Sequence, residues 1–266
     1  MDLLFDPLFR LPFVAGLMAA IVVAITGLYL RLRAEWLAAL GFAHLAGAGG
    51  VVGVIIGAPP LAAALGASVI AVLVKGALQR SGNDVYAWLI LFGWAAMLIG
   101  ATFTHHAKIL GDALVDGQLY FAASAELWAT LSIAAATAIA LPLLSRSLLR
   151  SELFPGHDRT NGRPLWPVTV GFDLLAAVAI AVAALVMGVM AAFALVFIPA
   201  WIAFALAGSW RLAVLWSGLI AAALYTVSYV TALLADLPFA PVLVAIAAAA
   251  APLRLLSKRL GPRPAS

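Results

Sequence analysis

The chain has 266 residues, of which 66% are apolar and only 10% charged, and its mean hydropathy is +1.14. A soluble domain is about 45–50% apolar and about 25% charged, so this composition excludes a water-soluble protein and leaves no polar stretch long enough for an ATPase domain. The lack of cysteine excludes disulfides and thiolate metal sites, and the net charge of +4 comes from short basic clusters between apolar runs, unlike the continuous basic stripe of a nucleic-acid-binding protein.

Uncharged apolar runs predict an all-α transmembrane bundle that forms a single domain over residues 1–266. A hydrocarbon core of roughly 30 Å is crossed by about 20 helical residues. The uncharged runs cover residues 11–30, 36–74, 85–104, 127–145, 174–210, 212–235 and 237–252. Two of them hold two spans each if Pro59-Pro60 and Gly188 are breaks, because proline and glycine interrupt helices. We therefore expect nine spans, or eight if residues 174–210 form one span plus a short or re-entrant helix.

Basic residues gather on one side of these predicted spans. If the N-terminus lies outside, thirteen of them face the cytoplasm: Arg31, Arg33, Lys75, Arg80, Arg146, Arg150, Arg159, Arg163, Arg211, Arg254, Lys258, Arg259 and Arg263. The other face receives only Arg10 and Lys108, together with Asp2, Asp6, Asp112, Asp116, Glu126 and Asp236. Because loops rich in lysine and arginine remain in the cytoplasm, the sequence predicts an N-out, C-in orientation.

His44 is the first candidate site residue along the chain. It lies within an uncharged run and near the middle of the predicted second span. An ionisable group at that depth is costly to bury and indicates function, and a neutral imidazole is a common zinc ligand. A histidine that merely hydrogen-bonds a neighbouring helix is the alternative.

An external loop of mixed charge follows the fourth predicted span. It contains His105 and His106, with Asp112, Asp116 and Glu126 further along. Acidic groups near an entrance raise the local cation concentration, so we treat the two histidines as weaker metal candidates. Their spacing matches no zinc signature of the His-Glu-x-x-His kind, and a solvated loop is the alternative.

The connection from residue 146 to residue 166 is the longest predicted cytoplasmic loop. It combines several charged residues with glycine and proline, and it is a candidate docking surface for a cytosolic partner through Arg150, Glu152, His157, Asp158 and Arg159. Taken alone, it is also consistent with an ordinary polar loop.

Two carboxylates lie close to the predicted ends of spans. Asp173 falls near a helix N-terminus, where the helix dipole favours an anion, and Asp236 precedes Leu-Pro in a turn before the last span. We treat both as candidates for the metal path, with a structural role as the alternative. No Walker A, Gly-x-Ser-x-Gly or His-Glu-x-x-His motif occurs in the sequence, so we do not expect the chain to be an enzyme or to bind a cofactor.

Three segments, in this order, resemble the metal-transporting ABC permease family that takes up zinc, manganese and iron in bacteria. The first combines Phe13-Val-Ala-Gly16, Arg31-Leu-Arg33 and Ala43-His44; the second is Gly188-Val-Met-Ala-Ala-Phe-Ala-Leu-Val-Phe-Ile-Pro199-Ala200; the third is Ser228 with Asp236-Leu-Pro238 and Pro241. The second is the most specific, and its Met-Ala-Ala-Phe-Ala-Leu-Val form looks closest to a zinc branch. The resemblance covers most of the chain.

The resemblance implies a type II-like ABC importer permease in the bacterial inner membrane. Such a subunit forms the pore as a homodimer, docks two cytosolic ATPase subunits through its internal loop and receives Zn²⁺, Mn²⁺ or Fe²⁺ from an extracytoplasmic binding protein. ATP is used by the partner, and the only other contact implied is with membrane lipid.

The sequence departs from the family pattern in front of His44. Family members usually carry a Gly-Asp pair there, and this chain has Ala39-Leu40, so the carboxylate that accompanies the histidine is missing. The acidic segment that the resemblance implies for ATPase docking is also poorly matched: this chain has Ser151-Glu-Leu-Phe-Pro-Gly-His157 there. Zinc is our first expectation, with a manganese or iron permease as the runner-up and a gradient-driven secondary transporter as a third interpretation.

Overall fold

The computed structural model describes residues 7–78, 83–117, 124–154, 156–162 and 164–256, and over these ranges the regular structure is helical. Asp2, Asp6, Arg80, Arg163, Lys258, Arg259 and Arg263, which contributed to the orientation argument, lie outside the described residues. The helices are α1 (Pro7–Leu32), α2 (Ala38–Ile56), α3 (Pro60–Ala77), α4 (Asn83–Ala101), α5 (His105–Asp116), α6 (Ser124–Leu153), α7 (His157–Thr160), α8 (Trp166–Met187), α9 (Val189–Leu206), α10 (Trp210–Ala235), α11 (Phe239–Ala250) and the 3₁₀ helix η3 (Ala251–Leu256).

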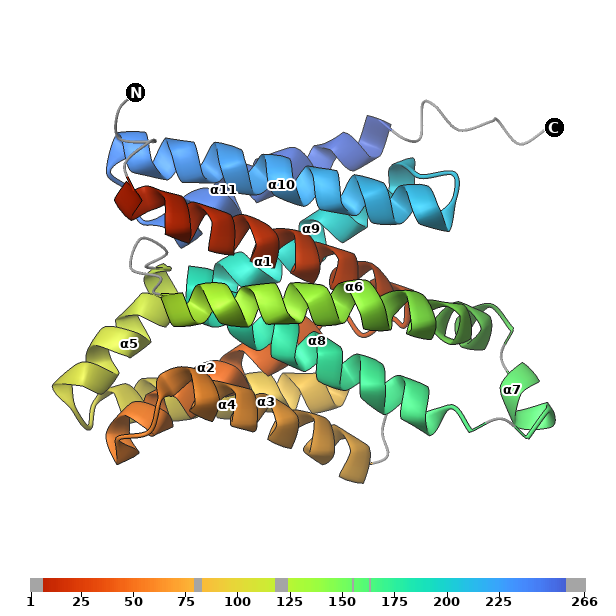
Figure 1. The fold of residues 1–266 in the computed structure, drawn as a ribbon, viewed down its shortest axis with the longest axis horizontal. Helices are drawn as coiled ribbons and strands as arrows, with labels where there is room; N and C mark the ends of the chain where they lie inside the picture. The colour runs from red at the N-terminus through yellow and green to blue at the C-terminus, as the bar shows by residue number, and fades with distance from the viewer. Residues whose placement is uncertain (1–6, 79–82, 118–123, 155, 163, 257–266) are drawn as a thin grey trace.

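Most of these helices run along one common axis and form a bundle (Figure 1). Eight of them are long and apolar enough to cross a membrane, and the apolar segment Phe239–Leu255 is shorter. The prediction of a polytopic helical bundle with eight to nine spans is therefore confirmed.

Both predicted breaks occur where the sequence placed them. Helix α2 ends at Gly57, which is left-handed, and Pro60 begins α3 as its first residue. Helix α8 ends at Met187, and α9 starts after the single residue Gly188, whose φ of 92° favours glycine. Phe204, near the end of α9, contacts Arg31 and Trp210, so α9 returns toward the side from which α8 departed.

Burial divides the bundle into interior and peripheral helices. Helices α1, α2, α8 and α9 form most of the core, which is rich in alanine, whereas α3, α4, α6 and α10 expose large apolar side chains such as Leu91, Phe92, Ile139 and Leu143. Small residues allow close helix packing where lipid gives no hydrophobic drive for association. The exposed apolar faces suit contact with lipid or with another membrane subunit.

Two predicted loops are largely helical in the structure. The segment from residue 105 contains the 12-residue helix α5, because Ala107, Gly111 and Leu114 repeat at helical spacing and are buried. The segment predicted as a cytoplasmic loop from residue 146 is helical as far as Leu153, since α6 continues past the apolar run. In Figure 1, α5 and α7 lie at opposite ends of the bundle.

Candidate functional site

His44 is buried in α2, with 7% of its surface exposed. Its Nδ1 lies 2.9 Å from the backbone oxygen of Leu40, one turn earlier. A carbonyl oxygen only accepts hydrogen bonds, so Nδ1 carries the proton in this arrangement. In the neutral ring, Nε2 is then the nitrogen with a free lone pair, which is the form in which histidine binds a metal.

Helix α4 passes very close to His44. A Cβ atom added at Gly93 would lie 2.7 Å from the backbone carbon of His44 and 3.0 Å from its Cβ. Only a glycine permits this approach without displacing a backbone. The contact fixes the position of His44 along the axis of α4.

Four charged side chains form a buried network where the α1–α2 connection meets the end of α3 and the N-terminal half of α8. Arg33 Nη1 donates to Asp173 Oδ1 at 2.7 Å, and Lys75 Nζ donates to Asp173 Oδ2 at 2.6 Å and to Glu35 Oε2 at 2.9 Å. Arg33 Nη2 completes the ring with Glu35 Oε1 at 3.2 Å, and Tyr86 on α4 donates to Glu35 Oε2 at 3.1 Å. We call these five residues the charge network.

The charge network balances two positive against two negative groups. Their side chains are between 3% and 8% exposed, and a buried charge is tolerated only when it is paired and hydrogen-bonded. Burial disfavours the charge of Arg33, but attraction from Asp173 and Glu35 outweighs that effect and raises the pKa of Arg33. The network joins the α1–α2 connection to α3, α4 and α8.

His44 lies deeper in the bundle than the charge network. A Cβ at Gly41 would contact Tyr86, whereas Gly93 is the residue that faces His44. Gly93 follows Tyr86 by seven positions on α4, which corresponds to roughly 10 Å along a helix. The charge network therefore lies about two helical turns from His44.

The structure does not gather the predicted metal candidates into one site. Both oxygens of Asp173 are held by Arg33 and Lys75. Asp236 is exposed and ends α10 in a left-handed conformation, and His105 and His106 are exposed in the first turn of α5. Among the described residues, no group of three histidine, aspartate or glutamate side chains is arranged to hold a metal ion.

The predicted docking segment is divided between the end of α6 and α7. Arg150 and the exposed Glu152 lie in the last turn of α6, whereas His157 and Asp158 begin α7. Arg150 Nε donates to Asp158 Oδ1 at 2.8 Å, which fixes α7 to α6. The side chain of Arg159 lies outside the described residues.

Sequence reasoning missed Glu35, Lys75 and Tyr86 as partners of Asp173. One signal was available: Glu35 is the acidic residue that follows Arg31 and Arg33 in a strongly basic turn. The pairing itself joins segments 40 and 98 positions apart, and no local pattern encodes it.

Comparisons with known proteins bear on the whole chain. The model of the ABC 3 transport family matches residues 6–257. PsaBC from Streptococcus pneumoniae in complex with Fab has a chain of similar fold, with a TM-score of 0.84 at 16% identity over 98% of this chain and 95% of that chain. A metal-chelate type ABC transporter in an inward-facing conformation matches with a TM-score of 0.65 at 16% identity, over 92% and 84% of the respective chains.

A comparison with curated proteins found no match to this chain. The two structural matches show the permease fold, and the family model covers nearly all of the described helices. This chain is therefore a multi-pass membrane protein that belongs to the ABC 3 transport family of metal ABC transporter permeases.

Proposed function

We propose that this chain is the permease subunit of an ABC importer that moves Zn²⁺ into the cytoplasm of a bacterium. His44 carries the proposal: it is buried in α2, and its Nδ1 bond to Leu40 leaves Nε2 as the nitrogen that can meet a metal ion. An ionisable group at this depth of a span is typical of a substrate path.

Zinc suits the ligand chemistry of this path better than manganese does. The chain offers no thiolate, and Leu40 stands where the family usually has a carboxylate. Mn²⁺ prefers carboxylate and other oxygen ligands, whereas imidazole suits zinc. A path with histidine and without that carboxylate should therefore favour Zn²⁺ over Mn²⁺.

The test is metal uptake into proteoliposomes that contain the permease, its ATPase and its extracytoplasmic binding protein. We expect ATP-dependent uptake of Zn²⁺ that exceeds uptake of Mn²⁺ and Fe²⁺. Uptake that is driven by a proton gradient without any ATPase would contradict the ABC importer. Preference for Mn²⁺ or Fe²⁺ would leave the importer intact and overturn the choice of ion.

His44→Ala tests the proposed ligand. Loss of a residue that only orients a metal ligand costs about 10–100-fold in affinity or activity. Loss of the proposed ligand itself should therefore lower Zn²⁺ uptake by at least about tenfold, while the assembled complex is recovered unchanged. Lys108→Ala is the control, because Lys108 is exposed on α5 and is not among the metal candidates, and its uptake should stay near that of the unmodified protein. Normal uptake by His44→Ala would mean that His44 only packs the bundle.

The proposal includes two cytosolic ATPase subunits that dock on the end of α6 and on α7, and a second copy of the permease. The Arg150–Asp158 pair holds α7 against α6 at the end of the bundle opposite to α5. Exchanging the two charges in the double variant Arg150→Asp/Asp158→Arg keeps a possible ion pair but places a carboxylate at position 150, whose side chain is the more exposed member of the pair. Copurification of the ATPase should fall, and unchanged copurification would count against this docking site.

A further inference from the structure

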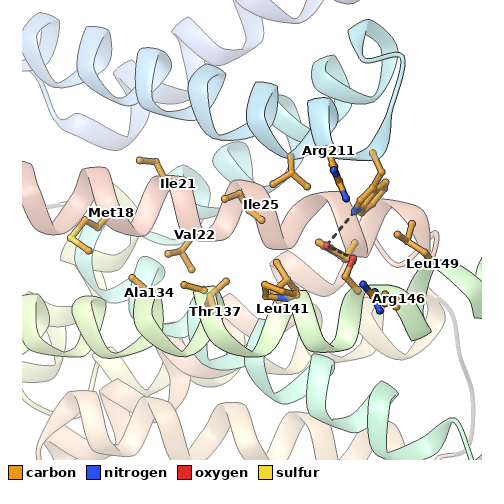
Figure 2. A pocket seen from close by; sticks show the side chains of 16 residues that line it. Met18, Ile21, Val22, Ile25, Ala134, Thr137, Leu141, Arg146, Leu149 and Arg211 are labelled. Carbon is orange, nitrogen blue, oxygen red and sulfur yellow. Dashed lines mark hydrogen bonds between the residues drawn. The ribbon is translucent and has the colours of Figure 1, made fainter.

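A long groove runs between α1, α6 and α10 (Figure 2). Its volume is about 920 Å³, and most of its wall is apolar. The apolar wall comes from all three helices and includes Met18, Ile21, Ile25, Ala134, Leu141 and Val214. It is large enough for a ligand of substantial size.

The groove is basic at one end only. Arg146 from α6 and Arg211 from α10 both lie at that end in Figure 2, whereas Met18 lies at the other. Both arginines are exposed, and within the described ranges no carboxylate forms an ion pair with either of them. The basic end therefore offers two positive charges to an anion.

A hydrogen-bonded chain joins the three helices beside these arginines. Trp210 Nε1 donates to Tyr29 Oη at 3.2 Å, and Tyr29 Oη lies 2.9 Å from Ser145 Oγ, to which it donates. Tryptophan and tyrosine are enriched at the level of lipid headgroups. Arg146 and Arg211 thus lie at the depth where a phosphate group would be found.

The length of the groove matches one leaflet of a bilayer. On α1 its wall runs from Met18 to Tyr29, which is roughly 16 Å along a helix. Half of a hydrocarbon core of roughly 30 Å is about 15 Å. A groove for a second copy of the chain would have no reason to stop at mid-depth, whereas an acyl chain ends there.

From this geometry we infer that the groove binds an anionic phospholipid, with its phosphate between Arg146 and Arg211 and an acyl chain along α1 and α6. Basic pockets between transmembrane helices recognise anionic headgroups in this way. The lipid belongs to the leaflet at the basic end, which is the cytoplasmic leaflet in an N-out, C-in orientation. It would occupy the space between α1, α6 and α10 and hold these three helices at a fixed separation.

Native mass spectrometry of the purified full-length permease, titrated with phosphatidylglycerol or phosphatidylcholine, tests the inference. We expect phosphatidylglycerol to bind more tightly, and Arg146→Gln/Arg211→Gln to weaken that binding by roughly tenfold or more, since each basic residue near an anionic lipid contributes to the attraction. Arg10→Gln/Lys108→Gln is the matched control: it removes the same charge from exposed positions outside the groove and should bind phosphatidylglycerol as before. Equal loss in both double variants, or equal binding of the two lipids, would overturn the inference.

A second pair of variants tests the acyl-chain part of the groove and the alternative occupant. Ala138→Trp places a bulky ring on the groove wall and should reduce phosphatidylglycerol binding while both arginines remain. Because the chain has no cysteine, Ala138→Cys gives a single thiol for oxidative cross-linking in membranes. We expect no disulfide-linked dimer. A disulfide-linked dimer would show that a second copy of the chain occupies the groove, and full lipid binding by Ala138→Trp would show that no acyl chain lies there.

Discussion

Lys75 lies between two carboxylates that come from different segments, at 2.9 Å from Glu35 and 2.6 Å from Asp173. Replacing it by methionine keeps an unbranched side chain but leaves two buried carboxylates with Arg33 as the remaining cation of the charge network. Removing one partner of a buried pair costs about 3–5 kcal/mol. We expect Lys75→Met to lower the free energy of unfolding by about that amount, measured by denaturant unfolding in detergent micelles.

Lys108→Met is the control for this loss, because Lys108 is exposed on α5. A surface substitution of this kind usually changes stability by about 0.5 kcal/mol or less. The double variant Lys75→Met/Asp173→Asn restores the charge balance between Arg33 and Glu35 and should recover part of the stability. If it were less stable than Lys75→Met by the full cost of a second pair, the two residues would not act as one network.

Tyr86→Phe removes a single hydroxyl from the charge network. The hydroxyl donates to Glu35 Oε2 at 3.1 Å, and the ring packs edge-on against Phe42 at 5.5 Å between centroids. A hydrogen bond to a charged group contributes about 1.5–3 kcal/mol, so unfolding should become easier by that amount. In a Glu35→Gln background the same substitution should cost less, and identical costs in both backgrounds would contradict the assignment.

Among the individual site residues, the sequence could predict His44 but not the partners of Asp173. His44 stands out because it is an ionisable residue inside an uncharged run, and this local signal places it in the buried part of α2. Asp173 has a comparable signal, but its role depends on Arg33 and Lys75, which join it only when α1, α3 and α8 pack together. Partners distant in sequence leave no periodic trace.

Element boundaries followed the sequence closely wherever proline or glycine carried a backbone requirement. The breaks at Pro59-Pro60 and Gly188 were predicted because proline and glycine interrupt helices. The structure gives the local reason: Pro60 is the first residue of α3, and Gly188 adopts a positive φ. Helix α5 was predicted as a loop because its first residues are polar. Its buried positions Ala107, Gly111 and Leu114 do repeat at helical spacing, so the periodicity was present in the sequence.

The contact between α2 and α4 depends on Gly93. In Gly93→Ala, the new methyl group would approach the backbone of His44 to 2.7 Å, and overpacking of this kind costs about 1–3 kcal/mol. We expect lower stability in detergent and, because His44 would move, weaker Zn²⁺ uptake. The comparison is with Gly66→Ala on α3, where the added Cβ meets nothing within 4 Å.

Gly66→Ala should keep the stability of the protein or raise it by about 0.5–1 kcal/mol, since alanine is a better helix former than glycine. Both variants make the same chemical change in a helix. A loss of similar size in the two would assign the effect to glycine replacement in general and not to the approach of α4 to His44.

At the scale of the whole molecule, the placement of charged residues along the sequence marks the limits of the transmembrane spans. The composition predicted a membrane protein, and the uncharged runs predicted most of its spans, because a bilayer requires long apolar helices. What the sequence could not supply is the arrangement of the helices around α1, α2, α8 and α9, since alanine and glycine are spread over nearly every span. Small residues permit close packing of many helix pairs and do not specify which pairs form.

The N-out, C-in orientation remains a prediction, and single cysteines test it directly because the chain has none of its own. Lys108→Cys lies on α5 and Thr160→Cys ends α7; both positions are exposed, at opposite ends of the bundle. The predicted topology assigns thirteen of the fifteen basic residues to the face that carries α7, and a bias of this kind should retain that face in the cytoplasm. A membrane-impermeant maleimide should therefore label Lys108→Cys in intact cells and Thr160→Cys only after permeabilisation, whereas the reverse pattern would invert the orientation and move the proposed lipid groove to the outer leaflet.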